Sequence, residues 1–155
     1  MMIKIVRTNS KNEDFINLVK KLDAYLKITD GEEHCFYNQF NSIEFLDNVV
    51  LVYKNNAAIG CGAFKKFDAN NVEIKRMYTS VDHRDQGIAT KILVEIEKWA
   101  FELGFISCIL ETGKRQKEAV KFYMKKFYKI TENYGQYIGV TNSVCFKKKI
   151  ENEKG

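Results

Sequence analysis

The fold of this chain is decided by a short stretch of sequence, Arg84-Asp85-Gln86-Gly87-Ile88-Ala89-Thr90. It lies between an apolar strand pattern at 72–80 and a helical apolar pattern that begins at Ile88. Gly87 lets the backbone approach a ligand closely, and the first N–H groups of a helix have no partner within the helix. Those N–H groups and the helix dipole attract negative charge. The stretch therefore predicts a binding site for a pyrophosphate, to which Thr90 adds a hydroxyl group and Arg84 a permanent positive charge.

The patterns on either side of this stretch predict a mixed α/β sheet. A capping box from Ser10 to Glu13 opens the first helix, and Lys54-Asn55-Asn56 is typical of a hairpin because asparagine tolerates positive φ. Gly104 ends the long helix that begins at Ile88. The predicted order is β-α-α-β-β-β-α-β-α-β-β, with elements at 3–7, 10–28, 32–46, 49–53, 57–64, 72–80, 88–103, 105–110, 115–126, 127–132 and 144–149.

The length and composition are those of an ordinary globular protein. With 155 residues, 45% of them hydrophobic and 29% charged, we expect a single domain over residues 1–155. No apolar run approaches the roughly 20 residues that a membrane-spanning helix needs. The first residues lack the apolar region of a signal peptide, so we expect a cytoplasmic protein without a membrane partner.

Neither the cysteines nor the charge indicates a metal or a nucleic acid. The four cysteines lie far apart without a histidine cluster, so we expect buried thiols at Cys35, Cys61, Cys108 and Cys145 and no metal site. The net charge of +5 comes from 25 basic and 20 acidic residues, and the basic residues form no stripe interleaved with aromatic ones. A small anionic cofactor would benefit from the same charge balance, and no nucleic-acid partner is expected.

Two motifs carry a resemblance to a known family. Arg84-x-x-Gly87-x-Ala89 resembles the R/Q-x-x-G-x-G/A signature of the GNAT acetyltransferases, and Ala119-Val120-Lys121-Phe122-Tyr123 resembles the A-x-x-L/F-Y element of that family's next helix. Two positions depart from the family pattern, because Val81 stands where the family often has proline and Phe127 where it usually has glycine. The resemblance implies the GNAT fold, with acetyl-CoA as cosubstrate and no metal.

The same resemblance implies where acetyl-CoA would bind. It would lie in a V-shaped opening of the sheet, between the strand at 72–80 and the strand at 105–110. The backbone of 77–79 would pair with the pantetheine arm, and the Met77 N–H would point at the thioester oxygen, where one such donor is worth about 3 kcal/mol. The residues implied to bind the cofactor are Met77, Tyr78, Thr79, Arg84, Asp85, Gln86, Gly87, Ile88, Ala89 and Thr90.

Transfer of an acetyl group to an amine requires a base, because an amine with a pKa of about 10 is mostly protonated at pH 7. Glu73 is the predicted base: it lies 14 positions before Gly87, the spacing of the catalytic glutamate in the histone-acetylating branch of the family. Strand alternation also places it on the same face as Met77. The alternative is that Glu73 forms an ion pair with Lys75 or Lys65 on an exposed strand face.

Tyr123 is the predicted general acid, which would protonate the departing CoA thiolate. A phenol at this position of the helix faces the sulfur atom in the relatives that the motif resembles. The alternative is that Tyr123, with Phe122 and Phe127, belongs to the apolar core at helical spacing.

The acceptor side of the site is less clearly marked. Glu111 ends a strand at the sheet's opening, so it could hold an ammonium group or share the role of base. In the helical stretch at 32–46, polar groups stand beside aromatic ones, and Glu33, His34 and Tyr37 are candidates for the acceptor pocket; a solvated helix face is the alternative. Strand alternation sends Lys75 and Arg76 to opposite faces, so at most one of them would bind an acceptor carboxylate.

Two segments near the C-terminus, at 133–137 and 142–144, indicate the kind of acceptor. Asn133-Tyr134-Gly135-Gln136-Tyr137 and Asn142-Ser143-Val144 resemble a segment of a bacterial GNAT subgroup that acts on small molecules. This likeness favours a primary amine on a small or amino-acid-like molecule over a protein or peptide. The alternatives are an acyl-CoA-binding module without turnover, a basic nucleic-acid-binding domain, and a nucleotide-dependent enzyme, which the hairpins at 49–79 disfavour. The sequence is compatible with a homodimer.

Overall fold

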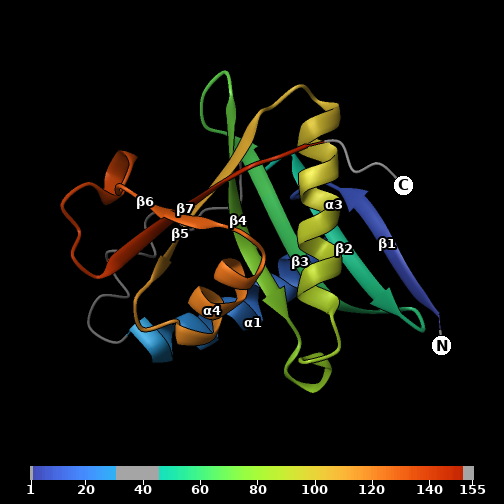
Figure 1. Cartoon of the computed structure of the whole chain (residues 1–155). Helices are drawn as coiled ribbons and strands as arrows, with labels where there is room; N and C mark the ends of the chain where they lie inside the picture. Colours follow the sequence, from blue (N-terminus) through green and yellow to red (C-terminus); the bar gives the residue numbers. More distant parts are fainter. Residues whose placement is uncertain (1, 31–45, 152–155) are drawn as a thin grey trace.

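The structure is a computed structural model that describes residues 2–30 and 46–151. A seven-stranded sheet with the strand order β1-β2-β3-β4-β5-β7-β6 forms its centre (Figure 1). The strands are β1 Ile3–Thr8, β2 Asn48–Lys54, β3 Ala57–Lys66, β4 Asn71–Thr79, β5 Ser107–Gly113, β6 Lys129–Thr131 and β7 Ser143–Lys149. The helices are α1 Glu13–Asp30, α3 Ile88–Glu102 and α4 Lys117–Lys125, with short 3-10 turns at Val81–His83 and Gly135–Tyr137. The predicted mixed α/β fold and the order of its described elements are confirmed. The helix predicted at 32–46 lies almost wholly outside the described residues.

Helices cover both faces of the sheet, α3 in front and α1 behind in Figure 1. Apolar residues of β2 alternate between the two sides: Val50 and Val52 pack in the core under α3, whereas Val49 and Leu51 pack in the core under α1. The core under α3 also contains Tyr123 of α4. The β4 strand is thus buried between two helical layers.

The start of α1 differs from the prediction. The side chain of Asn12, one residue before the helix, accepts hydrogen bonds from the backbone N–H groups of Asp14 at 2.9 Å and Phe15 at 3.2 Å. The backbone N–H of Ser10 instead donates to the Leu46 carbonyl at 3.0 Å. The capping box predicted from Ser10 to Glu13 is therefore wrong, because asparagine two residues further along caps the helix directly.

Pairing between β4 and β5 is short. All neighbouring strands are antiparallel except β4 and β5, which run parallel and pair only from Asn71 opposite Ser107 to Glu73 opposite Ile109. Beyond this point β4 continues to Thr79 and β5 to Gly113 without pairing with each other. The sheet therefore opens into the V shape that the family resemblance implied.

Strand β4 also contains a β-bulge. Arg76 has a left-handed φ of 59°, and the pairing with β3 shifts there, so that Tyr78 lies opposite Cys61 but Lys75 opposite Ala63. The single residue between them on β3, Gly62, thus faces two residues of β4. A bulge of this kind interrupts the alternation of side chains along a strand.

The bulge changes which side chains of β4 share a face. Met77 packs in the core under α3, together with Val72 and Ile74, so the intervening Glu73 points to the other face of the sheet. The prediction that Glu73 shares a face with Met77 is therefore wrong. Alternation fails because the extra residue at the bulge shifts the period of the strand by one.

The same shift brings two basic residues together. Lys75 is paired with Ala63, a member of the core under α1, and the Arg76 guanidinium forms an ion pair with Asp23 of α1. Both side chains therefore point to the α1 face, and the prediction that they lie on opposite faces is wrong. A sequence with an undetected bulge gives the right strand but the wrong face beyond it.

The close approach of β3 and α3 can be tested at Gly62. A Cβ atom there would lie 2.5 Å from the Met77 sulfur and 2.7 Å from a branch of Ile92. Gly62→Ala should therefore lower the free energy of unfolding by about 1–3 kcal/mol, the usual cost of overpacking. Urea unfolding measures this loss.

Gly139→Ala is the matched control, because a Cβ atom at Gly139 meets nothing within 4 Å and reports only the cost of its φ of 81°. Gly62→Ala that unfolds at the wild-type urea concentration would contradict the described packing between β3 and α3.

Candidate active site

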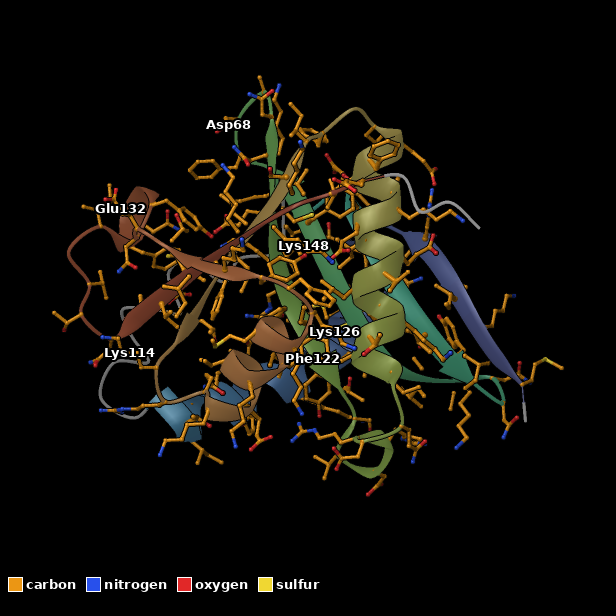
Figure 2. The ribbon with its side chains drawn as sticks, in the orientation of Figure 1. Asp68, Lys114, Phe122, Lys126, Glu132 and Lys148 are labelled. Atoms are coloured by element: carbon orange, nitrogen blue, oxygen red, sulfur yellow. The ribbon has the colours of Figure 1, made fainter. Side chains whose placement is uncertain are left out.

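The opening between β4 and β5 is a cleft of about 870 Å³. Its walls come from α1, β4, the loop before α3, the end of β5, α4 and Tyr137. Figure 2 shows Phe122 and Lys126 on the side of α4 that faces α3, and both residues line the cleft. The cleft therefore extends from the loop at the start of α3 to the divergence point of the two strands.

The loop before α3 has the geometry of an anion site. Gly87 has a φ of 78°, and its carbonyl accepts the first helical hydrogen bond from the Lys91 N–H at 3.1 Å. The N–H groups of residues 88–90 precede this bond, and such groups at a helix start have no intrahelical partner. A Cβ atom at Gly87 would meet nothing within 4 Å, so there is room at this position for a bound group.

Arg84 is held beside this loop by aromatic rings. Its Nε atom donates to the Thr79 carbonyl at 3.1 Å. Its guanidinium carbon lies 5.4 Å from the ring centre of Tyr25 on α1 and 5.8 Å from that of Tyr78 on β4. These contacts fix a positive charge at the mouth of the cleft.

Nine of the ten residues predicted to bind the cofactor line the cleft. They are Met77, Tyr78, Thr79, Arg84, Asp85, Gly87, Ile88, Ala89 and Thr90. Gln86 does not line it, and its side-chain amide donates to the Asp82 carbonyl at 3.5 Å. The structure therefore brings the predicted set together with one exception, and the role of each residue stays a prediction.

Glu73 is buried in the inner part of the cleft, with 3% of its surface exposed. One carboxylate oxygen accepts a hydrogen bond from the Tyr134 hydroxyl at 2.7 Å, and the other lies 3.9 Å from the Lys75 ammonium. The exposed strand face considered as an alternative is therefore wrong, although the ion pair with Lys75 is present. Burial and the negative charge of Glu73 raise the pKa of Tyr134 far above its usual value.

Tyr123 is both a core residue and a cleft residue. Its ring packs edge-on against Phe122 at 5.1 Å and Tyr128 at 5.6 Å, and it lines the cleft. Burial raises the pKa of the Tyr123 phenol well above its usual value of 10.0. Because Tyr123 lines the cleft, its phenol is in a position to donate a hydrogen bond there.

On the acceptor side, the structure describes only part of the predicted set. Glu111 lines the cleft and accepts a hydrogen bond from the Ser143 hydroxyl at 2.7 Å. Glu33, His34 and Tyr37 lie outside the described residues.

The structure adds Tyr134 and Tyr137 to the site. Tyr134 stacks edge-on between Phe67 at 5.1 Å and Tyr137 at 5.8 Å, and Tyr137 lines the cleft. Burial, Glu111 and Glu73 together raise the pKa of Tyr137. Tyr134 is 61 positions from Glu73, so no local pattern joins them; the family-like segment at 133–137 was the available signal.

The described cysteines fit the expected buried thiols. Burial raises the pKa of Cys61 and Cys108 to about 12 and that of Cys145 to about 11, so these thiols stay protonated. Within residues 2–30 and 46–151, no three His, Cys, Asp or Glu side chains are grouped to hold a metal ion. None of the described helices has the length and apolar character needed to cross a membrane.

This arrangement has a clear counterpart among known proteins. Residues 15–127 match the model of the acetyltransferase (GNAT) family, which is more than half of the chain. The chain belongs to the GNAT family. The resemblance noted in the loop at 84–90 is thereby confirmed.

Individual GNAT proteins resemble this chain over different lengths. The uncharacterized N-acetyltransferase YsnE of Bacillus subtilis is 33% identical over 100 residues, which cover 63% of this chain and 66% of YsnE. The match thus spans just under two thirds of that relative.

Solved structures show the same fold over nearly the whole chain. A Klebsiella pneumoniae protein assigned to the acyl-CoA N-acyltransferases is 24% identical with a TM-score of 0.81, covering 97% of this chain and 99% of its own. A GNAT acetyltransferase of Elizabethkingia anophelis, solved with acetyl-CoA bound, is 18% identical with a TM-score of 0.67. The match covers 96% of this chain and 98% of that protein.

The loop of this GNAT chain can be tested by Gly87→Ala. The added methyl group has room in the protein itself, so the fold should lose only about 1–2 kcal/mol from the left-handed φ. It would occupy the space beside the helix N-terminus that a pyrophosphate needs, so we expect affinity for acetyl-CoA to fall at least about tenfold. Isothermal titration calorimetry measures the affinity.

Gly104→Ala is the matched control. Gly104 has a φ of 94°, meets nothing within 4 Å of its Cβ position, and lies at the other end of α3 outside the cleft. It should lose similar stability and keep full affinity. Equal affinity in both variants would mean that the loop is only a connector.

Proposed function

We propose that this GNAT chain transfers an acetyl group from acetyl-CoA to a primary amine on a small, amino-acid-like molecule. The observation that carries the proposal is that the loop before α3, the edge of β4 left unpaired by β5, Glu73 and Tyr123 all line one cleft. An acyl-binding module without turnover would need the loop and the strand edge but not the two ionisable groups.

The lining of the cleft fits acetyl-CoA in three ways. The N–H groups at the start of α3 and the open space at Gly87 suit a pyrophosphate. The edge of β4 from Ile74 to Thr79 does not pair with β5, and an amide-containing arm can pair with such an edge. The thioester supplies the activated acetyl group.

The residues of this chain would then act on the acceptor and the leaving group. Glu73, buried and held by Tyr134, would take a proton from the acceptor ammonium, directly or through water, so that the free amine attacks the thioester. The backbone N–H of Met77 would donate to the thioester oxygen as negative charge develops there. Tyr123, whose side chain lines the cleft, would donate its phenolic proton to the departing sulfur.

Ligand binding and turnover test the proposal directly. Acetyl-CoA at about 100 times its dissociation constant should stabilise the fold by about 2.7 kcal/mol, whereas NAD and ATP should not. Scanning fluorimetry measures the shift, and a screen of amines and amino acids for CoA release measures turnover. If acetyl-CoA stabilises the fold but no amine causes release of CoA, the chain is a binding module without turnover. If only peptides cause release of CoA, the acceptor is a protein.

Replacing each of the two proposed catalytic residues should change the dependence of turnover on pH in a different way. Tyr123→Phe should lower turnover about 100-fold at every pH, because the packing remains but the donor is lost. Glu73→Gln should lose rate mainly at neutral pH and recover as the pH approaches the pKa of the amine, where the unprotonated acceptor needs no base. The kcat measured across a pH series, with the best acceptor of the screen, separates the two.

Tyr128→Phe is the control for Tyr123→Phe. Tyr128 stands in the same aromatic cluster, donates to Glu97 at 2.7 Å and does not line the cleft. Its variant should lose stability but not turnover. Full turnover by Tyr123→Phe would make Tyr123 a core residue only, and an unchanged pH profile for Glu73→Gln would move the role of base to Glu111.

A further inference from the structure

The buried carboxylate in the cleft is held by a residue from outside the cleft lining. Tyr134 does not line the cleft, but its hydroxyl donates a hydrogen bond to Oε2 of Glu73 at 2.7 Å. The other oxygen of the carboxylate, Oε1, lies 3.9 Å from the Lys75 ammonium. A buried carboxylate is costly unless it is hydrogen-bonded, so the bond from Tyr134 stabilises Glu73 in its charged form.

The hydroxyl of Tyr134 is fixed in place by its surroundings. The ring packs edge-on against Phe67 at 5.1 Å and Tyr137 at 5.8 Å. The side-chain amide of the preceding residue, Asn133, ties the start of the loop at 133–143 to its later part. It donates to three backbone carbonyls, at 3.0 Å, 3.0 Å and 3.3 Å, which are those of Tyr137, Val140 and Ser143. The loop is thus a rigid support for the hydroxyl that meets Glu73.

Tyr134 keeps the proton of this hydrogen bond over a wide range of pH. An ordinary tyrosine has a pKa of about 10 and loses its proton in alkaline solution. Burial, and after it the negative charge of Glu73, raises the pKa of Tyr134 far above that value. The phenol therefore remains a donor at the alkaline pH at which an acceptor amine is free of its own extra proton.

Other charged and titratable groups also surround Glu73. Among the described residues they come from β3, β4, β5, β7, α1 and the loop itself, and they are Lys65, Lys75, Arg76 with its partner Asp23, Glu111, Cys145 and Tyr137. A change of Tyr134 to phenylalanine removes none of them. A change in the pH dependence of turnover in that variant would therefore report the lost hydrogen bond.

We propose that Tyr134 is a positioning residue for acetyl transfer: it fixes the charged carboxylate of Glu73 through Oε2 and leaves Oε1 to take the proton of the acceptor. The inference rests on the proposed role of Glu73 as the base and adds a residue that the substrates need not touch. In this step the acceptor ammonium gives one proton to Oε1, directly or through water, and the carboxylate becomes a carboxylic acid. The O–H bond of Tyr134 stays intact, and the lone pair of the amine attacks the thioester carbon.

Tyr134→Phe tests the role, because it removes the donor and keeps the ring. A hydrogen bond to a carboxylate favours its charged form, so the variant should lose the charged base at a higher pH than the wild type. We expect the acidic limb of the kcat profile to move up by about one pH unit, which lowers kcat on that limb about tenfold. The rate should recover toward alkaline pH, and the affinity for acetyl-CoA, measured by calorimetry, should not change.

A double variant shows whether Tyr134 acts through Glu73. Adding Tyr134→Phe to Glu73→Gln should change kcat less than about twofold, because the carboxylate on which Tyr134 acts is already absent. Tyr128→Phe is the matched control. Tyr128 also donates to a carboxylate at 2.7 Å, that of Glu97, and does not line the cleft. Its variant should keep the wild-type pH profile.

The outcomes separate the positioning role from the proposed function. If Tyr134→Phe keeps the wild-type profile while Glu73→Gln is impaired at neutral pH, or if Tyr134→Phe lowers kcat equally with and without the Glu73 carboxylate, the positioning role is overturned and Glu73 remains the base. A wild-type profile for Glu73→Gln overturns the role of both residues and leaves acetyl transfer standing, and a screen in which no amine releases CoA overturns all three. A shifted profile in Tyr134→Phe that disappears in the double variant and is absent in Tyr128→Phe establishes the positioning role.

Discussion

The limited pairing of β4 with β5 is the constraint on which the rest of the site depends. Three residue pairs join two halves of one sheet, and beyond Glu73 and Ile109 the strands separate. Full pairing would fill the cleft with backbone hydrogen bonds and leave no edge of β4 for a ligand. The long helix α3 and the helix α4 pack on the same face across this gap, so the opening is supported by a continuous apolar core. The space for chemistry is thus created by an incomplete sheet.

The bulge in β4 gives this opening its chemical character. With regular alternation, Lys75 and Arg76 would point to opposite faces, one of them into the core under α3. The bulge sends both to the α1 face, where Lys75 lies near Glu73 and Glu111 and Arg76 pairs with Asp23, and it sends Met77 into the opposite core. Lys75, Arg76, Glu73 and Glu111 therefore all line the same cleft. Tyr137 adds a phenol to the lining from the C-terminal part of the chain, and Tyr134 behind the lining donates to Glu73.

The sequence predicted what depends on local patterns. The loop at 84–90 was recognisable because glycine, arginine and a helical apolar period stand together, and the hairpin was recognisable from Asn55 and Asn56, which have φ values of 51° and 69°. What depends on distant contacts was missed. The bulge follows from the pairing with Gly62, and the Tyr134–Glu73 hydrogen bond spans 61 positions. The cap of α1 was misplaced for a smaller reason, since serine and asparagine both satisfy helix N–H groups and only the structure shows which one does.

The bulge also restricts how this strand can change during evolution. Deleting one residue from β4 would restore the regular alternation, and every side chain after the deletion would turn to the opposite face. An inserted residue would have a comparable effect. Changes of chain length in this half of the sheet are therefore expected in the turn at 68–70, where Asp68 holds the backbone N–H groups of Asn70 and Asn71, and not within the strand. We therefore expect proteins that share this site to keep the length of β4.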